Sequence, residues 1–206
     1  MRLVSFALVP GLLLQPVLAG AALADDCLAR VQAIVADSAN IRPSKGHLIT
    51  ETKGLPTTEN EFFIASSAHM LFKPIDPPDL PWSLTYIDTN YQSADEGQTW
   101  TVGYTFDPEQ QAEGSRAYVQ GMADSAINAQ CGSEDLDGRT LEVVEADMST
   151  TGGDDKNYHA KYWYDSEIDL VVKSVSTTLV SGMEMTVTQT WEPAEGLDLP
   201  VPDGVE

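Results

Sequence analysis

Positively charged residues are scarce in this sequence. Its 206 residues include 11 Lys and Arg against 32 Asp and Glu, which gives a formal net charge of −21 at pH 7. Charge-driven binding to nucleic acid or to anionic lipid needs a basic surface, so the composition argues against both kinds of partner. Apolar residues make up 42% of the chain and are interleaved with the acids throughout. This pattern predicts an acidic folded domain rather than a disordered one.

The common motifs of catalytic and metal sites are also missing. The sequence contains no G-x-S-x-G, no H-E-x-x-H and no phosphate-binding glycine loop. Its three histidines, His47, His69 and His159, form no metal-ligand pair. Residues 133–138 resemble the start of a calcium loop, but Val144 stands where a bidentate Glu is required, which favours a hairpin turn. We expect no catalytic residue, metal or cofactor, and keep a hydrolase with converging carboxylates as a remote alternative.

Only one long apolar run is present, at the N-terminus. Residues 4–18 are almost wholly apolar, and residues 22–24 read Ala-Leu-Ala, the small-x-small pattern that signal peptidase recognises. The run contains two prolines and is shorter than the about 20 apolar residues of a transmembrane helix. We therefore predict a cleaved signal peptide over residues 1–24, a single domain over residues 25–206, no membrane span, and a periplasmic or secreted location.

Cysteine is rare as well. The only two, Cys27 and Cys131, lie 104 positions apart, and neither belongs to a C-x-x-C motif. Exported chains meet an oxidising compartment, so we expect one structural disulfide rather than a reactive thiol. In the chain-entropy model, a bridge that closes a loop of this size contributes about 4.7 kcal/mol.

Two helices are predicted. Apolar residues at i, i+3 and i+7 predict the first over residues 26–39. Asp107 followed by Pro108 is a typical helix start, and Gly132 is a typical stop, so the second helix is expected between them. This interpretation places Cys131 at the end of the second helix, where the disulfide would join two helix ends.

The remainder of the chain predicts antiparallel strands. Period-two alternation and turn residues place them at 47–52, 61–65, 69–73, 84–87, 100–106, 141–146, 158–164, 170–179 and 183–191. The last four follow one another through short connections, which predicts a meander, and the strand at 100–106 is expected to bury one face. Residues 74–81 include four prolines and are predicted to form a rigid surface connection.

Large aromatic and methionine side chains recur on the predicted apolar face of the sheet. Methionine is common on surfaces that accept varied apolar ligands, and a curved sheet that leaves a gap beneath its helices would line a cavity with such residues. A fully covered sheet would use the same residues as ordinary core, so both interpretations stay open. The candidate lining residues are Trp100, Tyr104, Phe106, Tyr162, Trp163, Met183, Met185 and Trp191.

The C-terminal third resembles a known family. Residues 162–173, Tyr-Trp-Tyr-Asp-Ser-Glu-Ile-Asp-Leu-Val-Val-Lys, stand where the periplasmic lipoprotein-carrier (LolA/LolB-like) superfamily has a strand, a W-x-D-x-x-T-G-L-P-like turn and a return strand. Residues 168–171, Ile-Asp-Leu-Val, replace the usual T-G-L-P, and residues 74–81 have no counterpart. Shorter matches are Asp137-Gly138-Arg139, Gly182-Met183 and residues 199–204. The rest of the chain is similar to the family in the order of its elements.

The resemblance implies an α+β fold in which a curved antiparallel sheet, an incomplete barrel, is covered on its open, concave side by two main helices. It also implies a hydrophobic cavity for acyl chains of lipids or lipoproteins, and no catalysis. The arginine in the carriers' cavity has no match by motif, and Arg42 and Arg116 are candidates by residue type alone. We therefore predict a soluble periplasmic carrier of a hydrophobic ligand, with an envelope protein-interaction or sensing domain as the alternative.

Overall fold

A computed structural model describes residues 19–151, 157–180 and 182–203 of the chain. Two helices and eleven strands make up its regular structure. In chain order these are α1 (Ala19–Asp37), β1 (Ser44–Thr52), β2 (Thr58–Ser66), β3 (His69–Asp76), β4 (Trp82–Tyr86), β5 (Thr89–Ser93), β6 (Thr101–Thr105), α2 (Pro108–Asp124), β7 (Ile127–Leu136), β8 (Arg139–Met148), β9 (Tyr158–Asp165), β10 (Leu170–Val180) and β11 (Met183–Pro193).

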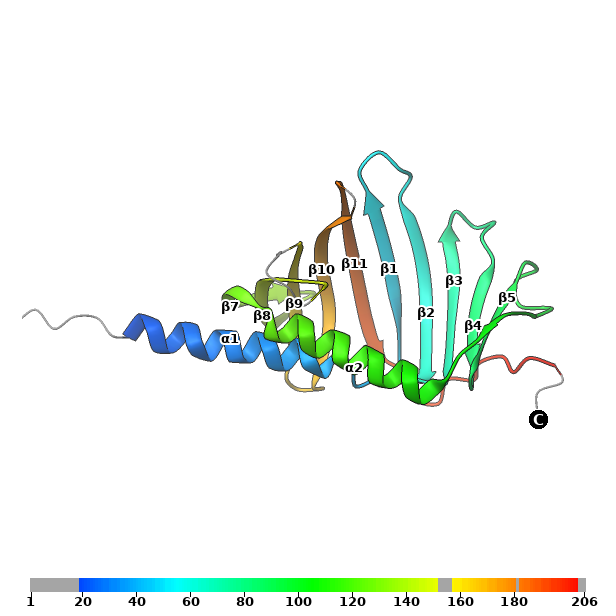
Figure 1. Cartoon of the computed structure of the whole chain (residues 1–206), viewed down its shortest axis with the longest axis horizontal. Coiled ribbons are helices and arrows are strands. Elements are labelled where there is room, and N and C mark those ends of the chain that lie inside the picture. Colours follow the sequence, from blue (N-terminus) through cyan, green and yellow to red (C-terminus); the bar gives the residue numbers. More distant parts are fainter. Residues whose placement is uncertain (1–18, 152–156, 181, 204–206) are drawn as a thin grey trace, which may run out of the picture.

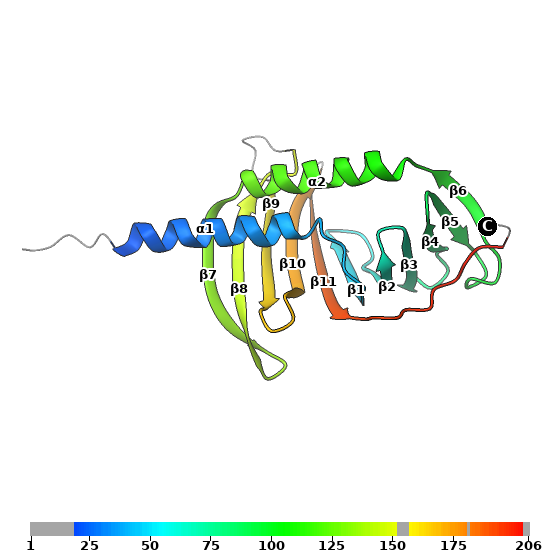
Figure 2. The ribbon, with the colours of Figure 1, turned by 90° about the horizontal axis from the view of Figure 1, so that it is seen from below.

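All eleven strands form one antiparallel sheet, in the order β6-β5-β4-β3-β2-β1-β11-β10-β9-β8-β7. One meander runs from β1 to β6 and a second from β7 to β11, and they join where β1 pairs with β11 from Ser44↔Pro193 to Thr52↔Met185. The edge strands β6 and β7 do not pair with each other, so the sheet is curved but not closed (Figure 1). Helix α2 carries the chain from one edge to the other (Figure 2).

Both helices lie on the same, concave face of the sheet (Figure 2). The main core fills the space between these helices and the strands β8 and β9, where apolar side chains of α1 and α2 meet small and branched side chains of the sheet. Its buried members are Val31, Ile34, Val35, Met122, Ala123, Ala126, Val144, Ala146, Met148 and Ala160. The predicted fold class, an α+β protein with two helices on one side of a curved antiparallel sheet, is confirmed.

The opposite, convex face carries a second core beneath the C-terminal segment. Leu199, which follows β11, is buried against Leu71, Leu84 and Tyr91 of three successive strands. The Nε2 atom of His69 lies 2.9 Å from the backbone oxygen of Pro200, the residue that follows Leu199. The C-terminal segment therefore covers the outside of the half of the sheet that begins with β1.

The first helix overlaps its prediction, and its early turns extend into the predicted signal peptide. Residues 1–18 lie outside the described residues, so most of that segment is beyond the structure. The predicted cleavage point after Ala24 falls inside α1. The signal peptide stays a prediction from the sequence.

The predicted end of the second helix is wrong. Asp107 caps its start as expected, since its carboxylate accepts hydrogen bonds from the backbone N–H groups of Glu109 and Gln110. The helix ends at Asp124, because the Ser125 backbone and hydroxyl satisfy its last carbonyl groups. The residues that follow pair with β8 as β7. Cys131 thus lies on an edge strand, and the confirmed disulfide with Cys27 joins α1 to β7 rather than two helix ends.

Three strand predictions also need correction. Strand β5 (Thr89–Ser93) lacks apolar alternation and was not expected, yet it pairs with neighbours on both sides. Strand β3 continues into the proline-rich segment through Pro74, where pairing with β4 has already stopped and β2 alone remains a partner. All five residues of β6 are exposed, because β6 is an edge strand and contributes to none of the hydrophobic cores. The Asp137-Gly138 turn joins β7 to β8 as a hairpin, as predicted.

Candidate functional site

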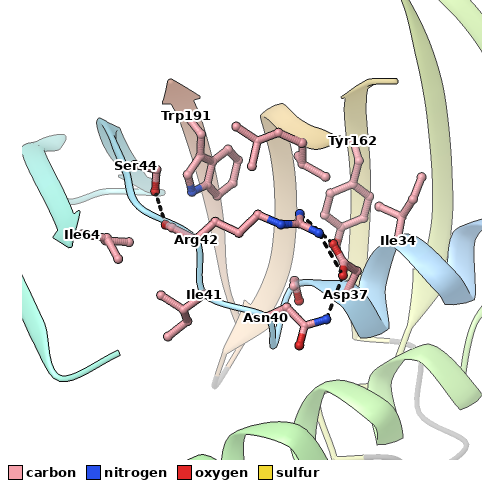
Figure 3. Close-up of a pocket in the computed structure, with 12 residues that line it drawn as sticks. Ile34, Asp37, Asn40, Ile41, Arg42, Ser44, Ile64, Tyr162 and Trp191 are labelled. Carbon is pink, nitrogen blue, oxygen red and sulfur yellow. Dashed lines mark hydrogen bonds and ion pairs between the residues drawn. The ribbon is translucent and has the colours of Figure 1, made fainter. Parts of the chain in front are cut away.

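A cavity of about 150 Å³ opens on the concave face where α1 ends (Figure 3). We call it cavity 1. Its walls come from the end of α1, the segment that leads to β1, and five strands from both meanders, so it lies across the seam where the meanders join. Its lining residues are Ile34, Asp37, Ser38, Asn40, Ile41, Arg42, Ser44, Ile64, Tyr162, Leu170, Val171 and Trp191.

A glycine shapes one wall of cavity 1. Gly46 of β1 is the register partner of both Trp191 on β11 and Phe62 on β2. Because Gly46 has no side chain, the two rings meet above it, edge to face, with 6.3 Å between their centroids. Phe62 is fully buried, and Trp191 remains at the cavity wall. The alternation along β11 thus brings a tryptophan to a site that the neighbouring strand leaves open.

The positive charge of cavity 1 is neutralised by acidic side chains. The guanidinium group of Arg42 lies 2.9 Å from a carboxylate oxygen of Asp37 and 3.3 Å from one of Asp169, and it donates a 2.8 Å hydrogen bond to the Asp169 backbone oxygen. Burial of the Tyr162 hydroxyl beside Tyr158 raises its pKa well above the ordinary value, so the phenol stays neutral. The remaining wall is mainly aliphatic and aromatic, which suits an uncharged apolar group.

A second cavity, of about 360 Å³, adjoins the first. We call it cavity 2. It lies between the first half of α2 and the turns that follow β2 and β4, and it shares Asn40 and Ile41 with cavity 1. Its lining residues are Ala39, Asn40, Ile41, Ser67, Ala68, Met70, Ile87, Phe106, Pro108, Gln111, Ala112, Ser115 and Arg116. The two cavities therefore lie next to each other on the helix side of the sheet, with Asn40 and Ile41 at their shared boundary, and we call the pair the trough.

Three of the eight predicted lining residues reach this trough. Tyr162 and Trp191 line cavity 1, and Phe106 lines cavity 2. Tyr104 lies next to Phe106, with 6.3 Å between the ring centroids, but its side chain is largely exposed on the edge strand. The role of these residues in binding a ligand stays a prediction.

The other four lie away from the cavity walls. Trp163 is buried on the convex face, because it follows Tyr162 on the same strand and successive side chains point to opposite faces. Trp100 packs beside the core beneath the C-terminal segment. Met183 and Met185 lie at the start of β11, where Met183 is exposed and Met185 half-buried.

The trough also contains residues that the sequence did not single out. The aliphatic side chains of Ile34, Ile41 and Ile64 line cavity 1, but nothing in their spacing distinguishes them from core residues. Both arginines named as candidates by type do reach the trough, Arg42 in cavity 1 and Arg116 in cavity 2. The only feature of the sequence that singles out these two arginines is that basic residues are rare in this chain.

No metal site is present in the described ranges, where no three His, Cys, Asp or Glu side chains gather in a suitable arrangement. None of the helices in this part of the chain is long and apolar enough to cross a membrane.

Comparison with solved structures identifies the fold. LprF from Mycobacterium bovis superposes with a TM-score of 0.50 at 14% sequence identity, over 87% of this chain and 98% of LprF. MucB in the Pseudomonas aeruginosa MucA/MucB complex gives a TM-score of 0.44 at 16% identity, over 82% of this chain and 59% of that one. The LolA superfamily protein NE2245 from Nitrosomonas europaea gives 0.34 at 10% identity, over 86% and 94%. The LprF superposition shows that this chain and LprF share their fold.

Sequence comparisons add nothing further, since no protein-family model and no curated protein matches the chain.

Proposed function

We propose that this protein is a non-catalytic periplasmic carrier that binds an apolar chain, such as the acyl chain of a lipid or lipoprotein, in the trough. The observation that supports this best is cavity 1, an apolar recess across the seam of the two meanders in which the single arginine is neutralised by Asp37 and Asp169. A neutral, apolar wall favours a hydrocarbon because each Å² of buried apolar surface contributes about 25 cal/mol before ordering costs.

The size of the trough is consistent with such a ligand. Cavity 1 alone, at about 150 Å³, is large enough for a group the size of a benzene ring, which a dry cavity of ~150 Å³ binds. Cavity 2 adds about 360 Å³, and the two together fall within the ~300–1,000 Å³ of ligand pockets. An extended chain that passes Ile41 would occupy both.

The location rests on separate observations. The predicted signal peptide directs the chain out of the cytoplasm, and the Cys27–Cys131 disulfide is typical of an oxidising compartment. A soluble carrier in the periplasm would shield the apolar part of its ligand from water during transfer.

A substitution at the junction of the two cavities tests the proposal. Ile41 lines both, and Ile41→Asp would place a carboxylate beside the bound chain. We expect the affinity of the delipidated protein for a fluorescent fatty-acid analogue to fall at least about tenfold, or ~1.4 kcal/mol. Ile75→Asp is the matched control, because Ile75 is also partly exposed and lines neither cavity. Absence of uptake by the wild-type protein, or equal loss in both variants, contradicts the proposal.

The edge strand β6 favours a second candidate function, the docking of an envelope protein. Its five residues, Thr-Val-Gly-Tyr-Thr, are all exposed and include no charge and no proline, the two common devices that protect a free edge. Val102→Lys would block strand addition. Under this function, cross-linking in an envelope extract yields one partner with the wild-type protein and with Ile41→Asp, and none with Val102→Lys.

A further inference from the structure

Arg116 differs from the other arginines of the described structure. Each of those has a carboxylate partner: Arg30 pairs with Glu142, Arg42 with Asp37 and Asp169, and Arg139 with Asp165. Within residues 19–151, 157–180 and 182–203, no carboxylate lies within ion-pair distance of Arg116. Its side chain is exposed on α2, and among the arginines of these ranges it alone has a charge that no acidic side chain neutralises.

The surroundings of Arg116 are also unusual. It is the only charged residue among those that line cavity 2, and no Asp or Glu is among them. The other polar groups there include the hydroxyls of Ser67 and Ser115 and the amides of Asn40 and Gln111, all of which can donate hydrogen bonds. Cavity 2 therefore offers one positive charge and several neutral donors, a combination that suits a negatively charged group.

The two cavities differ in the charge that they offer to a ligand. In cavity 1 the positive charge is already neutralised by two aspartates, whereas in cavity 2 it is available. On the basis of the proposed function, we infer that the ligand is an anionic amphiphile. Its carboxylate or phosphate head group binds Arg116 in cavity 2, and its apolar chain passes Ile41 into cavity 1.

Arginine is well suited to this role, and a free anion is not the expected ligand. The guanidinium group presents a planar fork of donors that matches carboxylate and phosphate oxygens, and it is weakly hydrated. The formal net charge of −21 repels a small anion that brings no apolar chain. Head group and chain together supply both the local contact and the burial that overcome this repulsion.

A pair of ligands that differ only in the head group provides the test. Delipidated full-length protein is titrated with dodecanoate and with 1-dodecanol at about pH 8, below the micellar concentration, and binding is read by displacement of a neutral fluorescent probe. We expect dodecanoate to bind about tenfold or more tightly, as a charge-assisted hydrogen bond would give. Arg116→Gln should remove this preference, and Arg116→Lys should keep binding selective for the anion.

Lys53→Gln is the matched control, because Lys53 is exposed, lines neither cavity and has no ion-pair partner in the described part of the chain. It changes the net charge as Arg116→Gln does and should retain the preference. Equal binding of both ligands by the wild-type protein, or an equal effect of both variants, overturns the inference and leaves the proposed function intact. Binding of neither ligand overturns both. Competition by acetate as strong as by dodecanoate also overturns the inference, since the site would then bind free anions.

Discussion

Gly46 shows how a single residue shapes the trough. A Cβ atom at this position would overlap the backbone oxygen of Thr190 and lie 2.7 Å from the Phe62 ring. We expect Gly46→Ala to lower the free energy of unfolding by about 1–3 kcal/mol or more, as overpacking does, in urea denaturation. Gly114→Ala, in the interior of α2 with nothing within 4 Å of the added methyl group, should instead stabilise by up to ~1 kcal/mol. Wild-type stability of Gly46→Ala would contradict the close packing of Phe62 over β1.

A second residue-scale prediction concerns pH. Hydrogen bonds from Thr99, through its hydroxyl at 2.6 Å and its backbone N–H at 2.8 Å, and from the Ser93 hydroxyl lower the pKa of Asp95 from 3.8 to about 2. Because the folded pKa is the lower one, the stabilisation by the ionised group is complete above 3.8 and is lost as the pH falls through about 2.

An NMR titration of the Asp95 carboxyl group should therefore show a midpoint near 2. Asp95→Asn should destabilise the protein at neutral pH, and this difference should shrink below the ordinary pKa of 3.8. Thr99→Val is the control, since it removes one donor and should move the midpoint upward. A midpoint at 3.8 in the wild-type protein would show that these hydrogen bonds do not form.

At the trough, the sequence predicts which residue types gather but not which face each one takes. Alternation placed Trp191 among the candidates, Tyr162 was included as a large aromatic residue, and both line cavity 1. Trp163 is also a large aromatic residue, but its position directly after Tyr162 directs it to the convex face. There the Nζ atoms of Lys161 and Lys173 lie 4.8 and 4.9 Å from the centroid of its ring. The isoleucines of the trough could not be distinguished, because an aliphatic side chain at a cavity wall and one in a core obey the same periodicity.

At the scale of elements, strong local sequence signals predicted where a helix begins, whereas strand pairing determined the boundaries that had no such signal. The start of α2 could be predicted from Asp107 and Pro108 alone, because helix capping is a local interaction. Its end was not predictable from Ala126 and Ile127, which continue the helical spacing, since pairing with β8 draws the following residues into β7. Strand β5 has no pattern of its own and exists through its two neighbours. Where tertiary pairing outweighs propensity, sequence periodicity misplaces the boundary.

The disulfide provides a prediction at this scale, because it ties helix α1 to the edge strand β7. The bridge closes a loop with a sequence separation of 104, so its removal should cost up to about 4.7 kcal/mol through the entropy of the unfolded chain. We expect the Cys27→Ser, Cys131→Ser double variant to unfold at a correspondingly lower urea concentration. The control is the reductant, which should destabilise the wild-type protein by the same amount and leave the double variant unchanged. Equal stability of variant and wild type would contradict the prediction.

At the scale of the molecule, the resemblance and the order of elements predicted the architecture, whereas the joining of its halves had no local signal. The C-terminal meander follows from short turns between strands. The pairing of β1 with β11 connects residues more than a hundred positions apart, for example Ser44 with Pro193, and no periodicity encodes such a contact. The trough lies across this seam, so its position could not be derived before the two meanders were joined.

Net charge is the last property of the whole molecule with a measurable consequence. With 32 acids against 11 bases, most carboxylates have no base to pair with, and their mutual repulsion destabilises the folded state. Salt shortens the range of this repulsion from about 30 Å at 0.01 M to about 10 Å at 0.1 M. We therefore expect the melting temperature, measured by circular dichroism, to rise with NaCl over this range. The rise should be about 2–4 °C for each ~1 kcal/mol that screening adds to the free energy of unfolding. Lys53→Glu, which adds negative charge without breaking an ion pair of the described structure, should steepen the dependence. A melting temperature that falls with salt would mean that attraction within the few ion pairs outweighs the repulsion among the excess acids.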